Sequence, residues 1–293
     1  MSTAALLPIA RDAVALASRL VRTRLPGVVQ DKSERDLVTE LDVLVERTLR
    51  EFLRERTPQI GFLGEEEGEH GTSDGGLRWA LDPIDGTSNF VHGLPLCAVS
   101  LGLVDAGRAV LGVIDLPLLG STYHAADGEG AFCGGTRLRA SSRANFRDAI
   151  VAIGDYAVGD DAKRRNQARF SLTRLLADNA HRVRMLGSAA IDLAWVAEGR
   201  LDGSVMLSNT PWDTSAGAVI AREAGAVVCD LDGSPHTTTS TATIAVGPAL
   251  AGDLLALVGK AIASAETGLP LGRAAAGGHD VCRAVPEIGG ACC

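Results

Sequence analysis

Paired cysteines are missing from this sequence. Its 293 residues include six cysteines, and no two of them form a C-x-x-C pair or a zinc-like spacing. They are Cys97, Cys133, Cys229, Cys282, Cys292 and Cys293. A zinc site is therefore disfavoured. Cys97 and Cys229 lie in apolar, strand-like runs, where we expect buried free thiols, and such thiols are typical of a protein in a reducing cytoplasm.

An excess of basic residues is also absent. The chain has 28 Lys and Arg against 36 Asp and Glu, which gives a formal net charge of −8. A surface of this sign argues against nucleic acid or an anionic membrane as the main partner. It does not exclude a phosphate-bearing substrate, because a bound divalent cation reverses the sign of the charge locally.

No apolar run is long enough to suggest a membrane span. The longest apolar region, Cys97–Leu119, is interrupted by Asp105, Arg108 and Asp115. Near the N-terminus, apolar residues recur every three or four positions, which predicts an amphipathic helix and not a signal peptide. These residues are Leu6, Ile9, Ala13, Leu16 and Leu20. We therefore expect a cytoplasmic protein without a membrane partner.

The composition, with 46% apolar and 22% charged residues, is that of a globular protein. We expect one catalytic domain over residues 1–271, with helices and an antiparallel sheet up to about residue 145. Strands and helices alternate after that point, which predicts a partly parallel sheet between helices. The tail, residues 272–293, is rich in Ala and Gly without periodicity, and we predict that it is disordered.

The stretch Leu81–Phe90 carries the clearest chemical signal, reading L-D-P-I-D-G-T-S-N-F. Asp82 and Asp85 offer the carboxylate oxygens that a hard cation requires. Gly86 permits a close approach of the backbone, and Thr87 can begin a helix whose free amides suit a phosphate. The pattern lacks the spacing of an EF-hand. It also lacks the acid pair of an aspartyl-nucleophile phosphatase, because Pro83 occupies the position of the first acid.

An ordinary Asp-rich turn remains the alternative unless further acids accompany this stretch. Three other stretches contain further acids: D-L-V-T-E-L-D at 36–42, G-E-E at 64–66 and W-D-T-S-A-G at 212–217. A fourth stretch, L-G-S-A-A at 186–190, contains no acid. In this order and spacing the sequence resembles the inositol monophosphatase family. The resemblance implies a layered αβαβα sandwich of the inositol monophosphatase and fructose-1,6-bisphosphatase type, in the α+β or α/β class. It also implies a Mg²⁺-dependent, lithium-sensitive phosphatase that forms homodimers.

The resemblance further assigns roles to individual residues. Two or three Mg²⁺ ions would be held by Glu65, Asp82, Asp85, Asp213 and the carbonyl of Ile84. Glu65 would also orient the attacking water, with Glu66 as the alternative, and Thr87 and Asp42 would form a hydrogen-bonded pair beside that water. The amides of Gly86, Thr87 and Ser88 would hold the phosphate, and Gly187, Ser188 and Ala189 would line the substrate pocket.

One position departs from the family pattern. Members that select inositol phosphate carry a Glu seven residues before the aspartate of W-D, and the corresponding residue is Met206. A thioether is a weak acceptor and cannot replace a carboxylate toward two hydroxyls. We therefore expect a broader or different specificity, unless the alignment slips here or Asp192, Ser208 or Asn209 supplies the contact.

The expected activity is hydrolysis of an inositol phosphate or a related cyclitol or sugar phosphate. Within the same superfamily, histidinol phosphate, a bisphosphorylated sugar or a 3′-phosphoadenosine nucleotide are alternatives. A function of another class is a regulatory binding role in a transcription complex, as some bacterial relatives have. Because every acid of the metal site is retained, the sequence favours catalysis.

Overall fold

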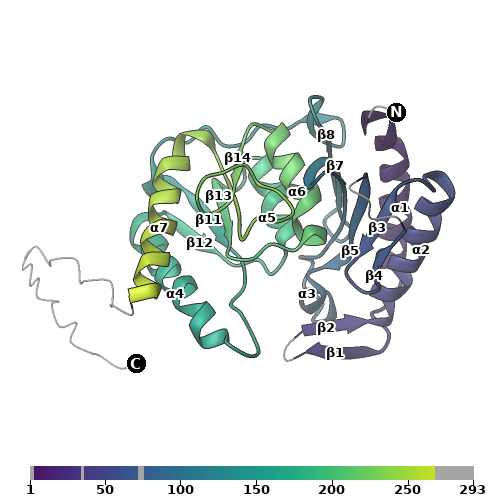
Figure 1. The fold of residues 1–293 in the computed structure, drawn as a ribbon, viewed down its shortest axis with the longest axis horizontal. Helices are drawn as coiled ribbons and strands as arrows, with labels where there is room; N and C mark the ends of the chain where they lie inside the picture. Colours follow the sequence, from purple (N-terminus) through teal and green to yellow (C-terminus); the bar gives the residue numbers. More distant parts are fainter. Residues whose placement is uncertain (1–2, 34–35, 72–75, 268–293) are drawn as a thin grey trace, which may run out of the picture.

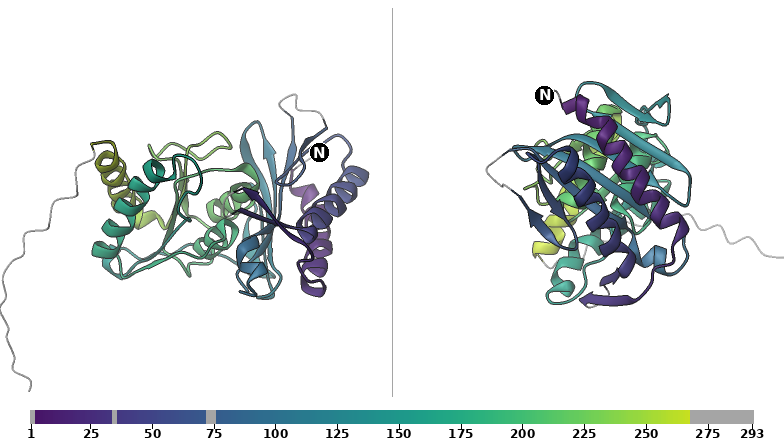
Figure 2. Two further views of the ribbon diagram at one scale, coloured as in Figure 1. Left: turned by 90° about the horizontal axis from the view of Figure 1, so that it is seen from below. Right: turned by 90° about the vertical axis from the view of Figure 1, so that its right-hand side faces the viewer.

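The chain folds into five alternating layers of helix and sheet (Figure 1; Figure 2). This computed structural model describes residues 3–33, 36–71 and 76–267. Helices α1 and α2 form one outer layer, followed by an eight-stranded sheet, helices α5 and α6, a five-stranded sheet, and helices α4 and α7. The layered αβαβα architecture expected from the sequence is confirmed.

The first outer layer consists of two amphipathic helices that pack against each other and against the eight-stranded sheet (Figure 2). Helix α1 (Leu7–Thr23) buries one apolar face, as its spacing predicts. Helix α2 (Glu40–Arg56) begins at Thr39 with a capping box, in which Thr39 and Asp42 satisfy each other's backbone amides. This cap fixes Asp42 in the first turn of the helix.

The eight-stranded sheet is antiparallel except for the parallel pairing of β3 with β5. Its spatial order is β10 (Thr136–Arg137), β9 (Gly130–Cys133), β8 (Ser121–Ala126), β7 (Arg108–Leu116), β6 (Ala98–Asp105), β5 (Arg78–Asp85), β3 (Gly61–Gly64) and β4 (Gly68–His70). The antiparallel sheet expected before residue 145 is therefore present.

Strand β5 includes the aspartates of the Leu81–Phe90 stretch. Asp82 pairs with Ser100 of β6 and Asp85 pairs with Ala98, and the register shifts between them. Pro83 has no N–H to donate to the ladder, which is consistent with an irregularity at this point. The short helix α3 (Thr87–Val91) follows at once.

A hairpin of β1 (Val29–Ser33) and β2 (Asp36–Thr39) lies below this region in Figure 1. The sequence does not predict this hairpin, because its residues are mostly polar and lack the apolar alternation of a half-buried strand. The hairpin has a consequence for the site, since it carries Lys32.

The second half contains a mixed sheet, as the alternation of strands and helices predicts. The order is β12 (Arg182–Arg184), β11 (Ile150–Ile153), β13 (Gly203–Met206), β15 (Thr243–Val246) and β14 (Val227–Cys229). Strand β11 is parallel to both of its neighbours, whereas β15 is antiparallel to both of its own. Helices α5 (Ala189–Ala197) and α6 (Pro211–Glu223) cover one face, and α4 (Ala162–Asn179) and α7 (Ala251–Thr267) cover the other.

Helix α7 raises the question of a membrane span. The segment Pro248–Ala265 is long and apolar enough to cross a membrane by length and composition, with a mean hydropathy of 1.3. Its buried residues Leu250, Leu254, Val258 and Ala261 belong to the core around the five-stranded sheet. An amphipathic helix that covers a sheet can have the same length and apolar composition, so this segment is only weak evidence for a membrane-spanning helix.

The expectation of buried thiols is confirmed for Cys97 and Cys229, which are free and buried. Cys282, Cys292, Cys293 and the tail 272–293 lie outside the described residues. The predicted division into a domain and a disordered tail therefore stays a prediction.

Helix α6 approaches the eight-stranded sheet closely because the sheet has two glycines at the contact. Gly102 of β6 and Gly112 of β7 lie opposite each other in register. A Cβ at Gly112 would sit 2.4 Å from the carbonyl oxygen of Ala216, and one at Gly102 would sit 2.7 Å from the Cβ of Ser215. Any side chain here would push α6 away from the sheet.

Gly112→Ala should therefore lower the free energy of unfolding by about 1–3 kcal/mol, the usual range for overpacking. The matched control is Gly259→Ala in α7, where a Cβ would meet nothing within 4 Å. That change should be neutral or stabilising by up to about 1 kcal/mol, since Ala favours a helix. Urea unfolding of both variants measures this, and equal midpoints would contradict the proposed steric role of Gly112.

Candidate active site

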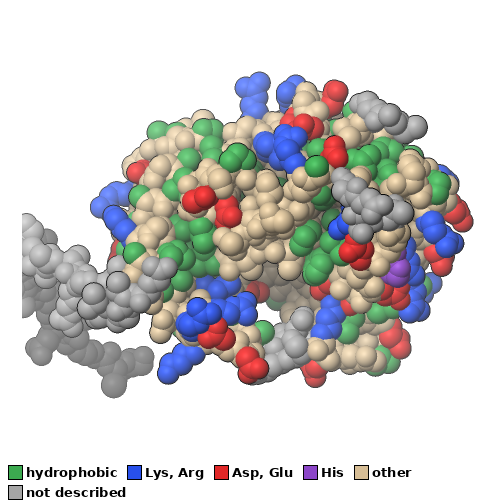
Figure 3. All heavy atoms as spheres, in the orientation of Figure 1, with side chains coloured by type: hydrophobic (Ala, Val, Ile, Leu, Met, Phe, Trp, Pro, Cys, Tyr) green, Lys and Arg blue, Asp and Glu red, His purple; other side chains and the backbone are tan. Residues whose placement is uncertain are grey.

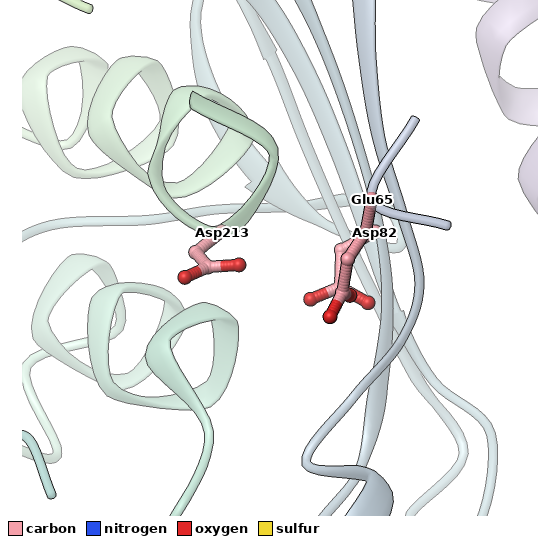
Figure 4. Close-up of side chains that lie close together, drawn as sticks. All are labelled: Glu65, Asp82 and Asp213. Atoms are coloured by element: carbon pink, nitrogen blue, oxygen red, sulfur yellow. The ribbon is translucent and has the colours of Figure 1, made fainter. Parts of the chain in front are cut away.

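Three acidic side chains from different elements meet between the eight-stranded sheet and α6. Glu65 follows β3, Asp82 lies in β5 and Asp213 lies in the first turn of α6. One oxygen from each lies within 4.8 Å of the others, and Figure 4 shows Asp213 facing the other two across the gap. We call these residues the acid group.

The acid group is electrostatically unfavourable without a cation. Burial, followed by the charges of Glu65, Asp85 and Asp213, raises the pKa of Asp82 well above its usual value. Burial and the charge of Asp85 raise the pKa of Asp213 to about 8. A cation among these oxygens would remove the repulsion. Because the donors are all carboxylate oxygens, the group suits a hard cation such as Mg²⁺, Ca²⁺ or Mn²⁺.

Asp85 lies next to the acid group but faces α5. Its oxygens accept hydrogen bonds from the Ser188 hydroxyl (2.5 Å) and from the amides of Ala190 (2.7 Å) and Ala189 (3.3 Å). Burial raises the pKa of Asp85 to about 6, although these donors oppose the shift. Asp85 thus connects β5 to the start of α5, and it stands outside the group of three.

The predicted pair of Thr87 and Asp42 is hydrogen bonded. The Thr87 hydroxyl lies 3.2 Å from Asp42 Oδ1 and 2.9 Å from the carbonyl oxygen of Ile84. Asp42 is fully buried and also accepts from the amide of Thr39. Burial raises the pKa of the Asp42 carboxyl, partly offset by these hydrogen bonds. The pair joins α2 to the turn after β5.

The turn 64–67 presents Glu65, and not Glu66, to the acid group. Glu46 of α2 holds this turn, because its two oxygens accept from the amides of Glu66 and Glu67, each at 2.8 Å. Gly64 leaves room for Glu46, since a Cβ there would lie 2.2 Å from Glu46 Oε1. Glu46 is not among the predicted site residues, although it stands four residues after Asp42 on the same face of α2.

Lys32 of the β1–β2 hairpin was also missed. Its Nζ lies 2.8 Å from Glu65 Oε1 and 2.6 Å from Glu66 Oε1. Burial raises the pKa of Glu66 to about 7, and the hydrogen bond from Lys32 opposes that shift. No local pattern marks Lys32, because only the folding of the hairpin brings it to the site.

The start of α3 faces the same region. Gly86 has a φ of +86°, and a Cβ there would lie 2.7 Å from the carbonyl oxygen of Leu96. A side chain is therefore excluded for both conformational and steric reasons. Asn89, another residue not foreseen, donates to the carbonyls of Leu96 (2.9 Å) and Leu186 (2.8 Å) and so ties α3 to the segment before α5.

A cavity of about 530 Å³ opens beside the acid group. The predicted substrate residues Gly187, Ser188, Ala189 and Met206 line it together with Asp85 and Asp213. Of the alternatives to Met206, Asp192 and Ser208 also line the cavity. Asn209 instead donates to the carbonyls of Thr237 and Ser240. Asp85 and Asp213 thus join the predicted metal residues to the predicted substrate residues, whereas Gly86, Thr87 and Ser88 are not among the residues that line the cavity.

The sequence and the fold of this chain are both similar to those of known proteins. A family model described as the inositol monophosphatase family matches residues 3–263. A Thermotoga maritima protein named fructose-1,6-bisphosphatase/inositol-1-monophosphatase is 37% identical over 213 residues, 72% of this chain and 77% of the relative. The Nus factor SuhB of Pasteurella multocida is 34% identical over 224 residues, 76% and 83% of the two chains. The crystal structure of the extragenic suppressor protein suhB from Bartonella henselae is similar with a TM-score of 0.81 and 32% identity, covering 87% of this chain and 99% of that one.

The raised pKa values predict how the metal-free protein responds to pH. Asp85 and Asp213 titrate in the folded state near 6 and 8, well above an unfolded Asp. The folded state therefore binds more protons between about pH 4 and 8, and its stability should fall as pH rises through this window. Melting temperatures in EDTA from pH 5 to 8.5 measure this fall, which Mg²⁺ should counteract.

Asp213→Asn removes one of the repelling charges. In EDTA at pH 8 its melting temperature should exceed that of the wild type, and its gain on adding Mg²⁺ should be smaller. Asp105→Asn, at an exposed acid at the end of β6, is the control and should follow the wild type. A metal-free Asp213→Asn protein less stable than wild type at pH 8 would show that the acid group is not repulsive.

Proposed function

The chain belongs to the inositol monophosphatase family, and from this premise we propose that it is a Mg²⁺-dependent phosphomonoesterase for an inositol phosphate or a related cyclitol or sugar phosphate. That it is a phosphoric monoester hydrolase follows from the family. The observation that supports the metal-dependent mechanism is the acid group of Glu65, Asp82 and Asp213 at the edge of a cavity.

We assign the metal site to the acid group with Asp85 and the carbonyl of Ile84 beside it. Mg²⁺ favours oxygen ligands and retains several waters, so acids from separate elements suit two or three ions. When bound, Mg²⁺ neutralises charge on the phosphoryl group and lowers the pKa of a bound water. Lys32 forms ion pairs with Glu65 and Glu66 in this structure, so a metal ion would compete with Lys32 for Glu65.

The remaining residues position the reactants. Glu65 would orient the attacking water from one side, while the Thr87 hydroxyl, which donates to Asp42, would accept a hydrogen bond from the water on the other. The amides of Gly86, Thr87 and Ser88 stand at the start of α3, where helix N–H groups have no partner within the helix. They would bind the phosphate oxygens. Gly187, Ser188 and Ala189 would contact the rest of the substrate.

Substitutions in the acid group test this assignment. Asp213→Asn and Glu65→Gln should each lower kcat by about 10²-fold or more, the usual scale for loss of a group that activates or positions the nucleophile. Glu66→Gln should have a smaller effect, since Glu66 lies outside the group. The assay is phosphate release from inositol 1-phosphate across a Mg²⁺ titration. Near-normal turnover of Asp213→Asn at saturating Mg²⁺ would refute the site.

Met206 is the residue through which we propose a specificity different from strict inositol 1-phosphate. It is buried, lines the cavity and packs close to Gly154. The absent carboxylate would be worth about 1.5–3 kcal/mol toward substrate hydroxyls, roughly one to two orders of magnitude in selectivity.

Met206→Glu should therefore raise kcat/KM for inositol 1-phosphate relative to other cyclitol and sugar phosphates. Met206→Gln, of similar size but uncharged, is the control and should give a smaller gain. A wild-type protein that already prefers the inositol ester strongly, and keeps that preference in both variants, would exclude Met206 as the specificity position.

A function of another class is a binding role in transcription. It is suggested by the relative named Nus factor SuhB, which is 34% identical to this chain. A binding role that is independent of hydrolysis would be kept by a variant such as Asp213→Asn, which would lose hydrolysis. Homodimer assembly and a cytoplasmic location likewise stay predictions.

A further inference from the structure

The segment between β13 and α6, residues 207–210, forms part of the cavity wall and leads to Asp213. Ser208 and Thr210 line the cavity, and the Thr210 hydroxyl donates a hydrogen bond to the Asp213 carboxylate. The segment belongs to no strand or helix. The orientation of the Asp213 carboxylate therefore depends on where this segment is held.

Asn209 holds this segment against the loop that joins β14 to β15. Its Nδ2 donates to the carbonyls of Thr237 (3.1 Å) and Ser240 (3.0 Å) in that loop. These two acceptors occupy both N–H groups of the amide, so the acceptor Oδ1 faces away from them. Oδ1 accepts from the hydroxyl of Thr214, in the first turn of α6, at 2.7 Å. One side chain thus joins the loop, the segment and the helix that carries Asp213.

His236 of the same loop supports Asn209. Its Nε2 lies 2.9 Å from Thr243 Oγ1 and 3.2 Å from Asn209 Oδ1. Both His236 and Thr243 are buried, and burial lowers the pKa of His236 to about 4, so its ring is neutral at pH 7. With its proton on Nε2, the ring donates to these oxygens. His236 therefore fixes the Asn209 amide without adding a positive charge that would compete with a cation at Asp213.

The loop between β14 and β15 lies above the hollow between the two halves of the molecule, in the view shared by Figure 1 and Figure 3. In Figure 3 the surface there consists mainly of uncharged side chains and backbone. Asn209 and His236 are not among the residues that line the cavity. Their effect on the site therefore passes through Thr210 and Thr214, which do line it.

Replacing a residue that holds a metal ligand in place commonly changes metal affinity or activity by about 10- to 100-fold. We propose that Asn209 is a positioning residue of the metal site: by binding the loop between β14 and β15 on one side and Thr214 on the other, it holds Thr210 and Asp213 where the cation binds. Asn209 itself contacts neither the ion nor the substrate. This inference rests on the metal assignment of the proposed function.

Asn209→Leu, a change that nearly keeps the size of the side chain, tests the proposal by calorimetric titration of the metal-free protein with Mg²⁺. At least one Mg²⁺ dissociation constant should rise by about 10- to 100-fold, because Asp213 loses its support. In phosphate release from inositol 1-phosphate, the Mg²⁺ concentration that gives the half-maximal rate should rise by the same factor. The KM for the ester at saturating Mg²⁺ should stay near its wild-type value.

Two further positions separate positioning from general stability. Thr214→Val removes the hydroxyl that donates to Asn209 and should weaken Mg²⁺ binding in the same way, whereas Thr214→Ser keeps a hydroxyl and should restore the binding. Thr241→Val is the matched control, because the Thr241 hydroxyl donates to Asp230 within the same loop, at 2.9 Å, and not to Asn209. This variant should keep the wild-type Mg²⁺ affinity even where its melting temperature falls.

Wild-type Mg²⁺ affinity in Asn209→Leu, or in Thr214→Val where Asn209→Leu does not fold, would overturn the inference. A Thr214→Ser protein as weak as Thr214→Val, or an equal loss of affinity in Thr241→Val, would overturn it as well, since the loss would then reflect a loosened structure. A wild type that binds Mg²⁺ but releases no phosphate from any ester would reject the proposed function, and the calorimetry would still decide the role of Asn209. A wild type that binds no Mg²⁺ would reject both.

Discussion

The depth at which α6 packs on the eight-stranded sheet decides where the site forms. Asp213 belongs to the first turn of α6, while Asp82 belongs to β5 of the sheet. Gly102 and Gly112, paired across β6 and β7, allow Ser215 and Ala216 to approach the backbone of the sheet directly. A helix held farther out would carry Asp213 away from Asp82. The two halves of the chain therefore share one site because two positions lack a side chain.

Buried acids around the site are held mainly by neutral donors. Asp42 is bonded by Thr39 and Thr87, Asp85 by Ser188 and two amides, and Glu46 by the amides of the turn 64–67. Neutral donors fix the geometry of a carboxylate without cancelling its charge. Negative charge consequently accumulates at one end of the cavity, where a hard cation is the natural counterion. Lys32 is the described cation that reaches Glu65, and it does so from a hairpin at the rim of the site.

Two arginines of α4, Arg165 and Arg169, also line the cavity. Arg169 donates its N–H groups to backbone carbonyls and so fixes the wall of the cavity, whereas Arg165, one turn earlier, is exposed to solvent. Met206 lies in the same cavity with a side chain that binds hydroxyls weakly.

Local patterns in the sequence were sufficient to predict several helices and strands of the fold. Apolar spacing predicted α1, and the alternation of strands and helices predicted the mixed second sheet. The resemblance to the family also assigned Glu65, Asp82 and Asp213 to one metal site, and these three acids lie close together in the fold. Such features depend on neighbours along the chain, and the sequence determines them by itself.

Tertiary structure alone decided the rest. The choice of Glu65 over Glu66 depends on Glu46, which lies about twenty residues away and holds the turn by its amides. Lys32 reaches the site only through the pairing of β1 with β2, and Arg165 faces the cavity only because α4 packs beside the ends of β11 and β13. These contacts join segments that are distant in sequence. They depend on how the segments pack in three dimensions, and no local periodicity or residue spacing predicts that packing.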